Sequence, residues 1–260
     1  MKIKMVVTDI DGTLMNDNNE IPCNTSEYIN VLINNGVKFV VASGRHINNL
    51  KSLFGESSTN IIFIAQNGAY VECNNSVLFY NTINREIINK ILFLATALKL
   101  KVMLYTQNSV IITDESSLLQ IKLKKYNVEY IINKEPDVDS VCKISLIATD
   151  DVDIYRCKNV LEQINGISVY VSNKDMLDIT NNNVNKGTAL NLLQNLYGVT
   201  PKETAVFGDS ENDIEMFKFS DFSYAMENAD NIVKKHAQYI APSNNNNGVF
   251  NTIKLLLGML

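Results

Sequence analysis

The chain has 260 residues, of which 46% are hydrophobic and 20% are charged, and its formal net charge is -5. This composition is typical of a folded globular protein and excludes a collagen, a coiled coil and a wholly disordered chain. The net negative charge argues against a protein that binds nucleic acid. The longest apolar stretches, such as residues 91–98, fall short of the roughly 18 residues that cross a membrane, so we expect no membrane partner.

We expect no N-terminal targeting segment, because Asp9 and Asp11 interrupt the first apolar run far too early for a signal peptide. The four cysteines lie far apart in the sequence without a CxxC pair, and the chain has two histidines. This spacing favours free thiols in a reducing compartment over a zinc site or a disulfide framework. We therefore predict a cytoplasmic protein, and the sequence leaves its oligomeric state open.

The first 80 or so residues alternate between predicted strands and helices. We expect strands at three apolar, β-branched runs, residues 4–9, 37–42 and 61–65. Helical spacing of apolar residues predicts a helix between the first two strands, ending at Gly36, and another between the second and third. Residues 70–73 and 77–80 are expected to form a hairpin. Buried strands linked by helices indicate a parallel sheet that helices cover.

The middle of the chain departs from this alternation, which suggests an α+β module. There we expect a helix over 84–100, a hairpin over 102–113, a helix over 117–126, a strand over 141–148, a helix over 152–164 and strands between 167 and 179.

After residue 183 the first pattern resumes. We expect a helix over 187–197, a strand over 204–207, a helix over 213–219, a strand over 222–225, a helix over 229–237, a strand at 239–240 and a terminal helix. The sequence therefore predicts an α/β domain built from residues 1–82 and 183–260, with an α+β domain, residues 83–182, inserted between them.

Two carboxylates follow the first predicted strand. Asp9 and Asp11 are separated by one residue and precede Gly12 and Thr13, within the long pattern MVVTDIDGTL. A carboxylate at the end of a buried strand costs stability unless a cation or a lysine pairs with it. Open parallel sheets place ligands beyond the carboxyl ends of their strands, so these acids are candidate functional residues. The structural alternative is an Asp-Gly turn with incidental acids.

Two further positions suit an anionic ligand. Ser43, Gly44 and Arg45 follow the second strand, where a hydroxyl and backbone N–H groups at a helix start can hold a phosphate, although Ser-Gly is also a common loop. Lys186 begins the helix after residue 185, where a cation opposes the helix dipole. A solvent-exposed lysine would be better placed elsewhere, but an ordinary surface lysine remains the alternative.

The run Gly-Asp-Ser-Glu-Asn-Asp, residues 208–213, follows the strand over 204–207 and opens the next helix. Oxygen ligands concentrated at a strand end suit a hard cation such as Mg²⁺. The acids could instead only cap that helix.

Taken together, residues 9–13, Ser43, Lys186 and residues 208–213 resemble, in order and sheet context, the haloacid dehalogenase superfamily of phosphotransferases. The closest resemblance is to the Cof-type phosphatases, in which a large α/β cap is inserted between the second and third motifs. It spans nearly the whole chain, although many relatives carry glycine where this chain has Glu227. The resemblance implies a Rossmann-like parallel-sheet core domain with an inserted α+β cap domain that selects the substrate.

The resemblance also assigns roles to residues. It implies that Asp9 attacks phosphorus to form an aspartyl-phosphate, and that Asp11 protonates the departing alcohol and then activates water. The implied substrate and phosphate-binding residues are Thr13, Ser43, Gly44, Lys186 and Asn212. The implied Mg²⁺ ligands are the Asp9 side chain, the Asp11 backbone carbonyl, Asp209 and Asp213, the last binding the ion directly or supporting its other ligands.

The resemblance thus implies a magnesium-dependent phosphatase, a hydrolase of phosphoric monoesters, that acts on small phosphorylated metabolites such as sugar phosphates. One alternative is a phosphomutase of the phosphomannomutase type, in which the same aspartyl-phosphate passes to a sugar hydroxyl. Another is a catalytically idle protein that binds a phosphate ligand. The idle protein is disfavoured by the intact set Asp9, Asp11, Lys186 and Asp209, because a binding protein needs no paired acid beside a nucleophile.

Overall fold

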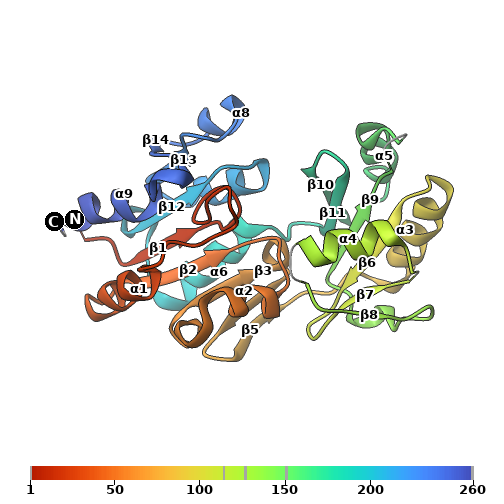
Figure 1. The fold of residues 1–260 in the computed structure, drawn as a ribbon, viewed down its shortest axis with the longest axis horizontal. Helices are drawn as coiled ribbons and strands as arrows, with labels where there is room; N and C mark the ends of the chain where they lie inside the picture. The colour runs from red at the N-terminus through yellow and green to blue at the C-terminus, as the bar shows by residue number, and fades with distance from the viewer. Residues whose placement is uncertain (1, 114, 126–127, 150–151, 259–260) are drawn as a thin grey trace.

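The computed structural model describes residues 2–113, 115–125, 128–149 and 152–258. Figure 1 shows two β-sheets arranged along the long axis of the molecule, with both chain termini at the end farthest from the second sheet. Within the described residues, the first sheet has eight strands and uses both ends of the chain. The second sheet has six strands in this part of the chain, all between residues 101 and 181. We call these two parts the core and the cap.

The core strands are β1 (Met5–Thr8), β2 (Lys38–Ala42), β3 (Ile62–Ala65), β4 (Tyr70–Cys73), β5 (Ser76–Tyr80), β12 (Thr204–Gly208), β13 (Phe222–Met226) and β14 (Tyr239–Ala241). Their order in the sheet is β14-β13-β12-β1-β2-β3-β4-β5. Neighbouring strands are parallel from β14 to β3, and β4 and β5 continue the sheet as an antiparallel hairpin. The carboxyl ends of the parallel strands therefore meet at one edge.

Helices cover both faces of the core sheet. One face carries α1 (Thr25–Asn34), α2 (Ile47–Phe54) and α9 (Gly248–Leu257), and the other carries α6 (Lys186–Tyr197), α7 (Ile214–Phe217) and α8 (Asn231–Lys234). Along β1, Val6 packs in the first layer, whereas Met5 and Val7 pack in the second. Since both faces of this strand are buried, Met5, Val6 and Val7 are apolar in succession, and the polar Thr8 that ends the strand is buried as well.

The cap strands are β6 (Lys101–Tyr105), β7 (Val110–Ile112), β8 (Tyr130–Ile132), β9 (Lys143–Ile147), β10 (Ile167–Asn173) and β11 (Met176–Asn181), in the order β10-β11-β9-β6-β7-β8. Helices α3 (Arg85–Ala97) and α5 (Ile154–Leu161) pack on one face. The other face carries α4 (Ser117–Lys125) and packs against Ala69 and Val184 of the core. This contact turns one face of the cap sheet toward the core.

The fold class that the sequence predicts is confirmed, and the predicted strands end close to the observed ones. Every cap strand lies inside the predicted insertion, residues 83–182, whose boundaries themselves stay a prediction. Among the described residues, no helix is both long and apolar enough to cross a membrane.

Some element predictions were wrong in detail. The helices expected over 213–219 and 229–237 are the shorter α7 and α8. Before α7, Asp213 lies in a 3₁₀ turn, where its carboxylate accepts hydrogen bonds from the backbone N–H groups of Asp209 and Ser210. Strand β8 was not predicted, because three residues are too few to show a strand period. The helix expected over 117–126 ends at Lys125, and Tyr126 lies outside the described residues.

Candidate active site

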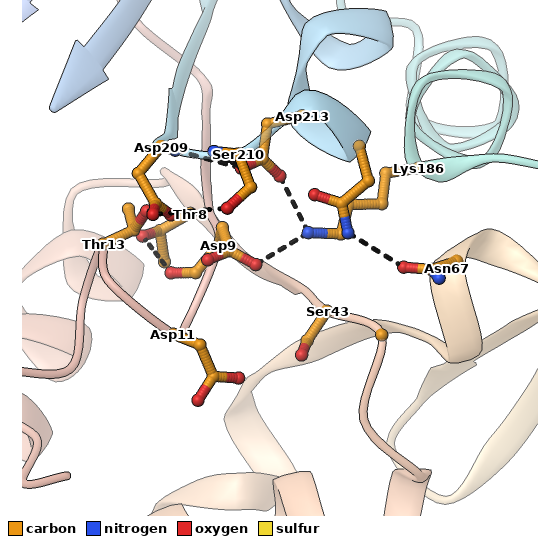
Figure 2. Close-up of polar contacts among 12 residues, drawn as sticks. Thr8, Asp9, Asp11, Thr13, Ser43, Asn67, Lys186, Asp209, Ser210 and Asp213 are labelled. Atoms are coloured by element: carbon orange, nitrogen blue, oxygen red, sulfur yellow. Dashed lines mark hydrogen bonds and ion pairs between the residues drawn. The ribbon is translucent and has the colours of Figure 1, made fainter. Parts of the chain in front are cut away.

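Three neighbouring core strands bring the predicted site residues to one edge of the sheet. β1 lies between β12 and β2 and is parallel to both, so Asp9, Ser43 and Asp209, which follow these strands, emerge side by side. The Asp9 backbone N–H continues the ladder by donating to the Phe207 carbonyl at 3.0 Å. The first residue of α6, Lys186, reaches the same edge, as Figure 2 shows.

Lys186 joins two carboxylates inside the protein. Its Nζ lies 2.7 Å from Asp9 Oδ1 and 2.7 Å from Asp213 Oδ1 (Figure 2). The residue is only 1% exposed, so the alternative of an ordinary surface lysine is wrong. Burial by itself would lower the pKa of Lys186, but the charges of Asp213 and Asp9 raise that pKa above its usual value. The ammonium therefore stays protonated between its two partners.

Close contacts fix the loops that carry these groups. Asn185 caps α6 by accepting a hydrogen bond from the Thr188 backbone N–H at 2.8 Å, while the Thr188 hydroxyl accepts one from the Asn185 N–H at 3.1 Å. Gly12 has a φ of +79°, and a Cβ there would lie 2.4 Å from Asp209 Oδ2. Glycine is thus required for the Asp9 loop to approach Asp209.

Asp9, Asp209 and Asp213 form a compact carboxylate group, with one oxygen of each within 4.8 Å of the others. Burial raises the pKa of Asp9 well above its usual value, against the lowering effect of Lys186, and the charges of Asp213 and Asp209 raise it further. Burial, and then the charge of Asp213, raise the pKa of Asp209 to about 7. One ammonium faces three acids, so full ionisation calls for another cation. Their oxygens are the donors that Mg²⁺ prefers.

Asp11 lies apart from this carboxylate group. Its carboxylate accepts hydrogen bonds from Arg45 Nε at 2.8 Å and Nη2 at 2.5 Å, and the Asp11 side chain is 47% exposed. Figure 2 shows the Asp11 side chain pointing away from Asp9. The predicted metal contact of Asp11 through its backbone carbonyl stays a prediction. The pairing of Asp11 with Arg45 was not foreseen from the sequence.

The predicted phosphate-binding residues divide into two groups. Ser43, Gly44 and Asn212 line the same cavity as Asp9. Thr13 and Lys186 are 1% exposed and lie behind its wall, where Thr13 donates to an Asp209 oxygen at 2.8 Å and Lys186 binds Asp9. In this structure these two residues therefore hold the carboxylates from behind.

A cavity of about 820 Å³ lies between core and cap, within the size range of small-molecule sites. Its core floor includes Asp9, Asp209 and Asn212. Its cap wall includes Met103, Tyr105, Lys143, Met176 and Asp178. A ligand in this cavity would contact both parts of the protein.

Two polar residues of this cavity, Lys143 and Asp178, were not singled out from the sequence, whereas Asn67 beside it belongs to the segment 66–69 that supports the resemblance but was given no role. The run Gln-Asn-Gly after the third strand was a usable signal for Asn67, because polar residues there follow a buried strand end. Lys143 and Asp178 lie within β9 and β11 of the cap, in runs that read only as strands.

The family model of the haloacid dehalogenase-like hydrolases matches residues 6–253 of this chain. The 5-amino-6-(5-phospho-D-ribitylamino)uracil phosphatase YbjI of Escherichia coli (strain K12) is 31% identical over 265 residues, which cover 99% of this chain and 97% of that protein. The predicted resemblance is thereby confirmed at the level of the family.

Solved structures agree with this assignment. SMU.1108c from Streptococcus mutans UA159 has a TM-score of 0.91 at 25% identity, covering 99% of this chain and 100% of that one. TM0651 from Thermotoga maritima has a TM-score of 0.84 at 27% identity, covering 97% of each chain. The chain therefore belongs to the haloacid dehalogenase-like hydrolases, and it is an enzyme of their phosphatase type.

Proposed function

We propose that this enzyme is a magnesium-dependent phosphatase that hydrolyses small phosphorylated metabolites through an aspartyl-phosphate on Asp9. The observation that carries the proposal is the position of Asp9 on the cavity floor, 5% exposed and paired with Lys186 from behind. A carboxylate held in one orientation beside a fixed positive charge suits a nucleophile, because neither group has to reorganise when phosphorus approaches.

In the proposed first step, Asp9 Oδ2 attacks phosphorus while Lys186 holds Oδ1. The new bond joins this oxygen to phosphorus, and the bond from phosphorus to the ester oxygen breaks. Asp11, after leaving Arg45 and taking up a proton from solvent, donates that proton to the departing oxygen, which leaves as an alcohol. In the second step Asp11 takes a proton from water, the water oxygen attacks phosphorus, and Asp9 is restored with release of inorganic phosphate.

Asp11 must leave Arg45 to act in this way. The Asp11 side chain is 47% exposed and so has room to turn about its own single bonds. Arg45 also lines the cavity, and a phosphate dianion would compete with Asp11 for its guanidinium. We infer that arrival of the substrate phosphate exchanges one partner of Arg45 for another and frees Asp11 for proton transfer.

Mg²⁺ would be held by the Asp9 side chain, the Asp11 backbone carbonyl and Asp209. When bound, the ion supplies positive charge that offsets the oxygens of the transferring group. Asp213 supports this site from beneath: its Oδ2 accepts the backbone N–H groups of Asp209 and Ser210, each at 3.0 Å. Ser43 and Asn212, which line the cavity, would bind the phosphoryl oxygens.

For the leaving group we propose a sugar or a sugar alcohol. The Escherichia coli relative is named for a substrate with a phosphorylated ribityl group, and the cavity of about 820 Å³ has room for a group of that size. This compound is therefore the first to test, together with hexose and pentose phosphates.

The decisive experiment measures phosphate release from a panel of phosphate esters with and without Mg²⁺. We expect Mg²⁺-dependent release that favours sugar or sugar-alcohol esters over aryl and nucleotide esters. Mannose 1-phosphate separates hydrolysis from mutase activity, because a phosphatase yields inorganic phosphate whereas a mutase yields mannose 6-phosphate. A folded, Mg²⁺-loaded enzyme that releases phosphate from no ester on the panel would refute the proposal.

A further inference from the structure

A series of buried polar contacts crosses from the cap sheet to the candidate active site. Lys143 of β9 lies 2.9 Å from Asp178 Oδ2 of β11, and each side chain is 3% exposed. Ser145 donates to the other Asp178 oxygen at 2.5 Å. The Lys143 ammonium also donates to the Gly44 carbonyl of the core at 2.8 Å. Buried ionic groups are costly without such partners, so this pair depends on contact between cap and core.

Asn67 receives these contacts on the core side. Its Nδ2 donates to Asp178 Oδ2 at 2.9 Å, and its Oδ1 accepts from Asn212 Nδ2 at 3.1 Å. The Asn67 backbone N–H donates to the Ser43 carbonyl at 3.0 Å. Asn67 is 2% exposed, so water does not replace these partners. One residue thus contacts the cap and both loops that we assign to phosphate binding.

The backbone at this point is held in an uncommon conformation. Gln66 and Asn67 have φ values of 54° and 56°, in the left-handed region that favours glycine. Such conformations persist where surrounding contacts fix them, and they are frequent at functional sites. Here Gln66 Nε2 donates to the Thr106 carbonyl of the cap at 2.8 Å. At Gly68 a Cβ would lie 2.2 Å from the Asn185 carbonyl oxygen, so the turn also packs closely on the start of α6.

We propose that Asn67 is a positioning residue through which the Lys143–Asp178 pair of the cap sets the arrangement of the Ser43–Gly44 loop and of Asn212. We call the side chains of Asn67, Lys143 and Asp178 the cap–core link. Contact of the cap with the core thereby assembles the pocket for the transferring phosphoryl group, whatever the leaving group is. This inference rests on the proposed function for its kinetic consequences, whereas the link itself has a readout that needs no activity.

The partners of Lys143 and Asp178 inside the protein favour a positioning role for this pair over direct contact with the substrate. The Lys143 ammonium has three partners, the Asp178 carboxylate, the Gly44 carbonyl and the Tyr105 ring. Its Nζ lies 4.2 Å from the centroid of that ring. The two oxygens of Asp178 accept from three side chains, Lys143, Asn67 and Ser145. Both residues line the cavity, but these groups are already used within the protein. A change in either residue should therefore act on the phosphate loops and not on the recognition of one leaving group.

The test uses the full chain and four variants: Asn67→Ala, Asp178→Asn, their double variant and Lys143→Met/Asp178→Asn. The last removes both charges of the pair and so avoids an unpaired buried ammonium if Asp178→Asn alone fails to fold. Asp139→Asn is the control, because Asp139 is a cap carboxylate that also pairs with a basic side chain, Arg85, but is exposed and lies away from the cavity. Folding is checked by circular dichroism for each variant.

In the folded variants of the link we expect kcat/KM to fall about tenfold, by the same factor for p-nitrophenyl phosphate and for the best metabolite ester. Inhibition by inorganic phosphate should weaken at least about fivefold, because the phosphate loops are shared by every ligand. The double variant Asn67→Ala/Asp178→Asn should lose no more than the worse single variant, since the residues act as a unit. Asp139→Asn should leave all these constants within about twofold of wild type.

Hydrogen exchange provides the readout that is independent of activity. The Gln66 and Asn67 N–H groups donate to the carbonyls of Arg45 and Ser43, each at 3.0 Å, so their exchange reports on contact between the two loops. We expect exchange at both amides to speed up about tenfold in the link variants and not in Asp139→Asn. If the protein shows no phosphatase activity but the link variants still show this faster exchange, the proposed function is refuted and the cap–core link is supported.

Three results would overturn the link. Losses that differ between esters, with phosphate inhibition unchanged, would make Asp178 a substrate-contact residue. A lower melting temperature with unchanged kinetics and exchange would make the pair a stability device. Additive losses in the double variant would show that Asn67 and Asp178 act independently.

Discussion

Asp9 and Lys186 lie 177 positions apart in the sequence, yet Lys186 Nζ is 2.7 Å from Asp9 Oδ1 inside the protein. Asp9 follows the central strand β1, and Lys186 begins the helix α6 that returns to the core after the cap. The whole cap is therefore inserted between the two members of one buried ion pair. Formation of that pair requires both ends of the chain to fold together, which is consistent with one continuous core sheet.

Asp9→Asn should abolish turnover, with less than a few per cent of wild-type activity left, because an amide oxygen is a poor nucleophile. The fold should persist, since the amide oxygen can still accept from Lys186. Phosphate release with Mg²⁺ measures the first point and circular dichroism the second. Asp221→Asn is the control, an exposed acid before β13 at the opposite edge of the sheet, and should keep full activity. A folded Asp9→Asn protein with substantial turnover would reject the assignment of the nucleophile.

Asp11→Asn should slow alkyl phosphates far more than p-nitrophenyl phosphate. A poor leaving group needs a proton from Asp11, worth roughly 10²–10⁴-fold in rate, whereas p-nitrophenol leaves without one. Pre-steady-state kinetics should show accumulation of the phosphorylated enzyme, because hydrolysis of the intermediate also loses its base. Equal losses for alkyl and aryl esters would count against the acid role.

Removal of metal should stop activity, and Mg²⁺ should restore it. The same ion should stabilise the fold, by about 2.7 kcal/mol when its concentration is 100 times its dissociation constant. Thermal unfolding with and without Mg²⁺ measures this shift independently of catalysis. Asp209→Asn should reduce it, because Asp209 belongs to the carboxylate group around Asp9. Full activity in a metal-stripped sample would remove Mg²⁺ from the mechanism.

Lys186→Met should destabilise the protein by about 3–5 kcal/mol, because it leaves two buried carboxylates without their shared cation. Denaturant unfolding measures the loss. Lys186→Met/Asp213→Asn should recover part of it, since one of the stranded charges is removed. Lys218→Met, which breaks an exposed pair with Glu215, should change stability by less than about 1 kcal/mol. Equal effects of the two lysine variants would contradict the role of burial.

His46 should make stability depend on pH below neutrality. Burial lowers the pKa of His46 to about 4, against the raising effect of its hydrogen bond to the Thr106 carbonyl. An unfolded histidine binds its proton near pH 6.5, so between about pH 6.5 and 4 the unfolded state binds more protons than the folded state, and stability falls as pH falls. From pH 7.5 to 5 this one group should cost about 2 kcal/mol.

The measurement compares unfolding free energies at pH 7.5 and 5 for wild type and His46→Gln. The variant should show a smaller loss on acidification, because glutamine does not titrate. His236→Gln, at an exposed position, should retain the wild-type loss. An unchanged loss in His46→Gln would assign the effect to other groups.

The fold class and most core strands could be predicted because their cause is local. Strands such as β1 are buried on both faces, so three of its four residues are apolar in succession and the run stands out in the sequence. The start of α7 could not be predicted in this way, because it depends on the contacts of the Asp213 side chain with two backbone N–H groups. Strand β8 was not predicted, because its short run is recognisable as a strand only by its pairing with β7 in the folded cap.

The sequence by itself was enough to predict the candidate site residues, because acids, hydroxyls and a lysine at strand and helix ends have few structural reasons to be there. The tertiary structure decided their pairing. Strand order places β1 between β12 and β2, which brings Asp9 beside Asp209, and the return of the chain after the cap brings in Lys186. It also decided that Asp11 pairs with Arg45 and that Lys143 of the cap reaches Gly44. Such contacts join residues distant in sequence, so no local pattern encodes them; they follow from how sheets and helices pack.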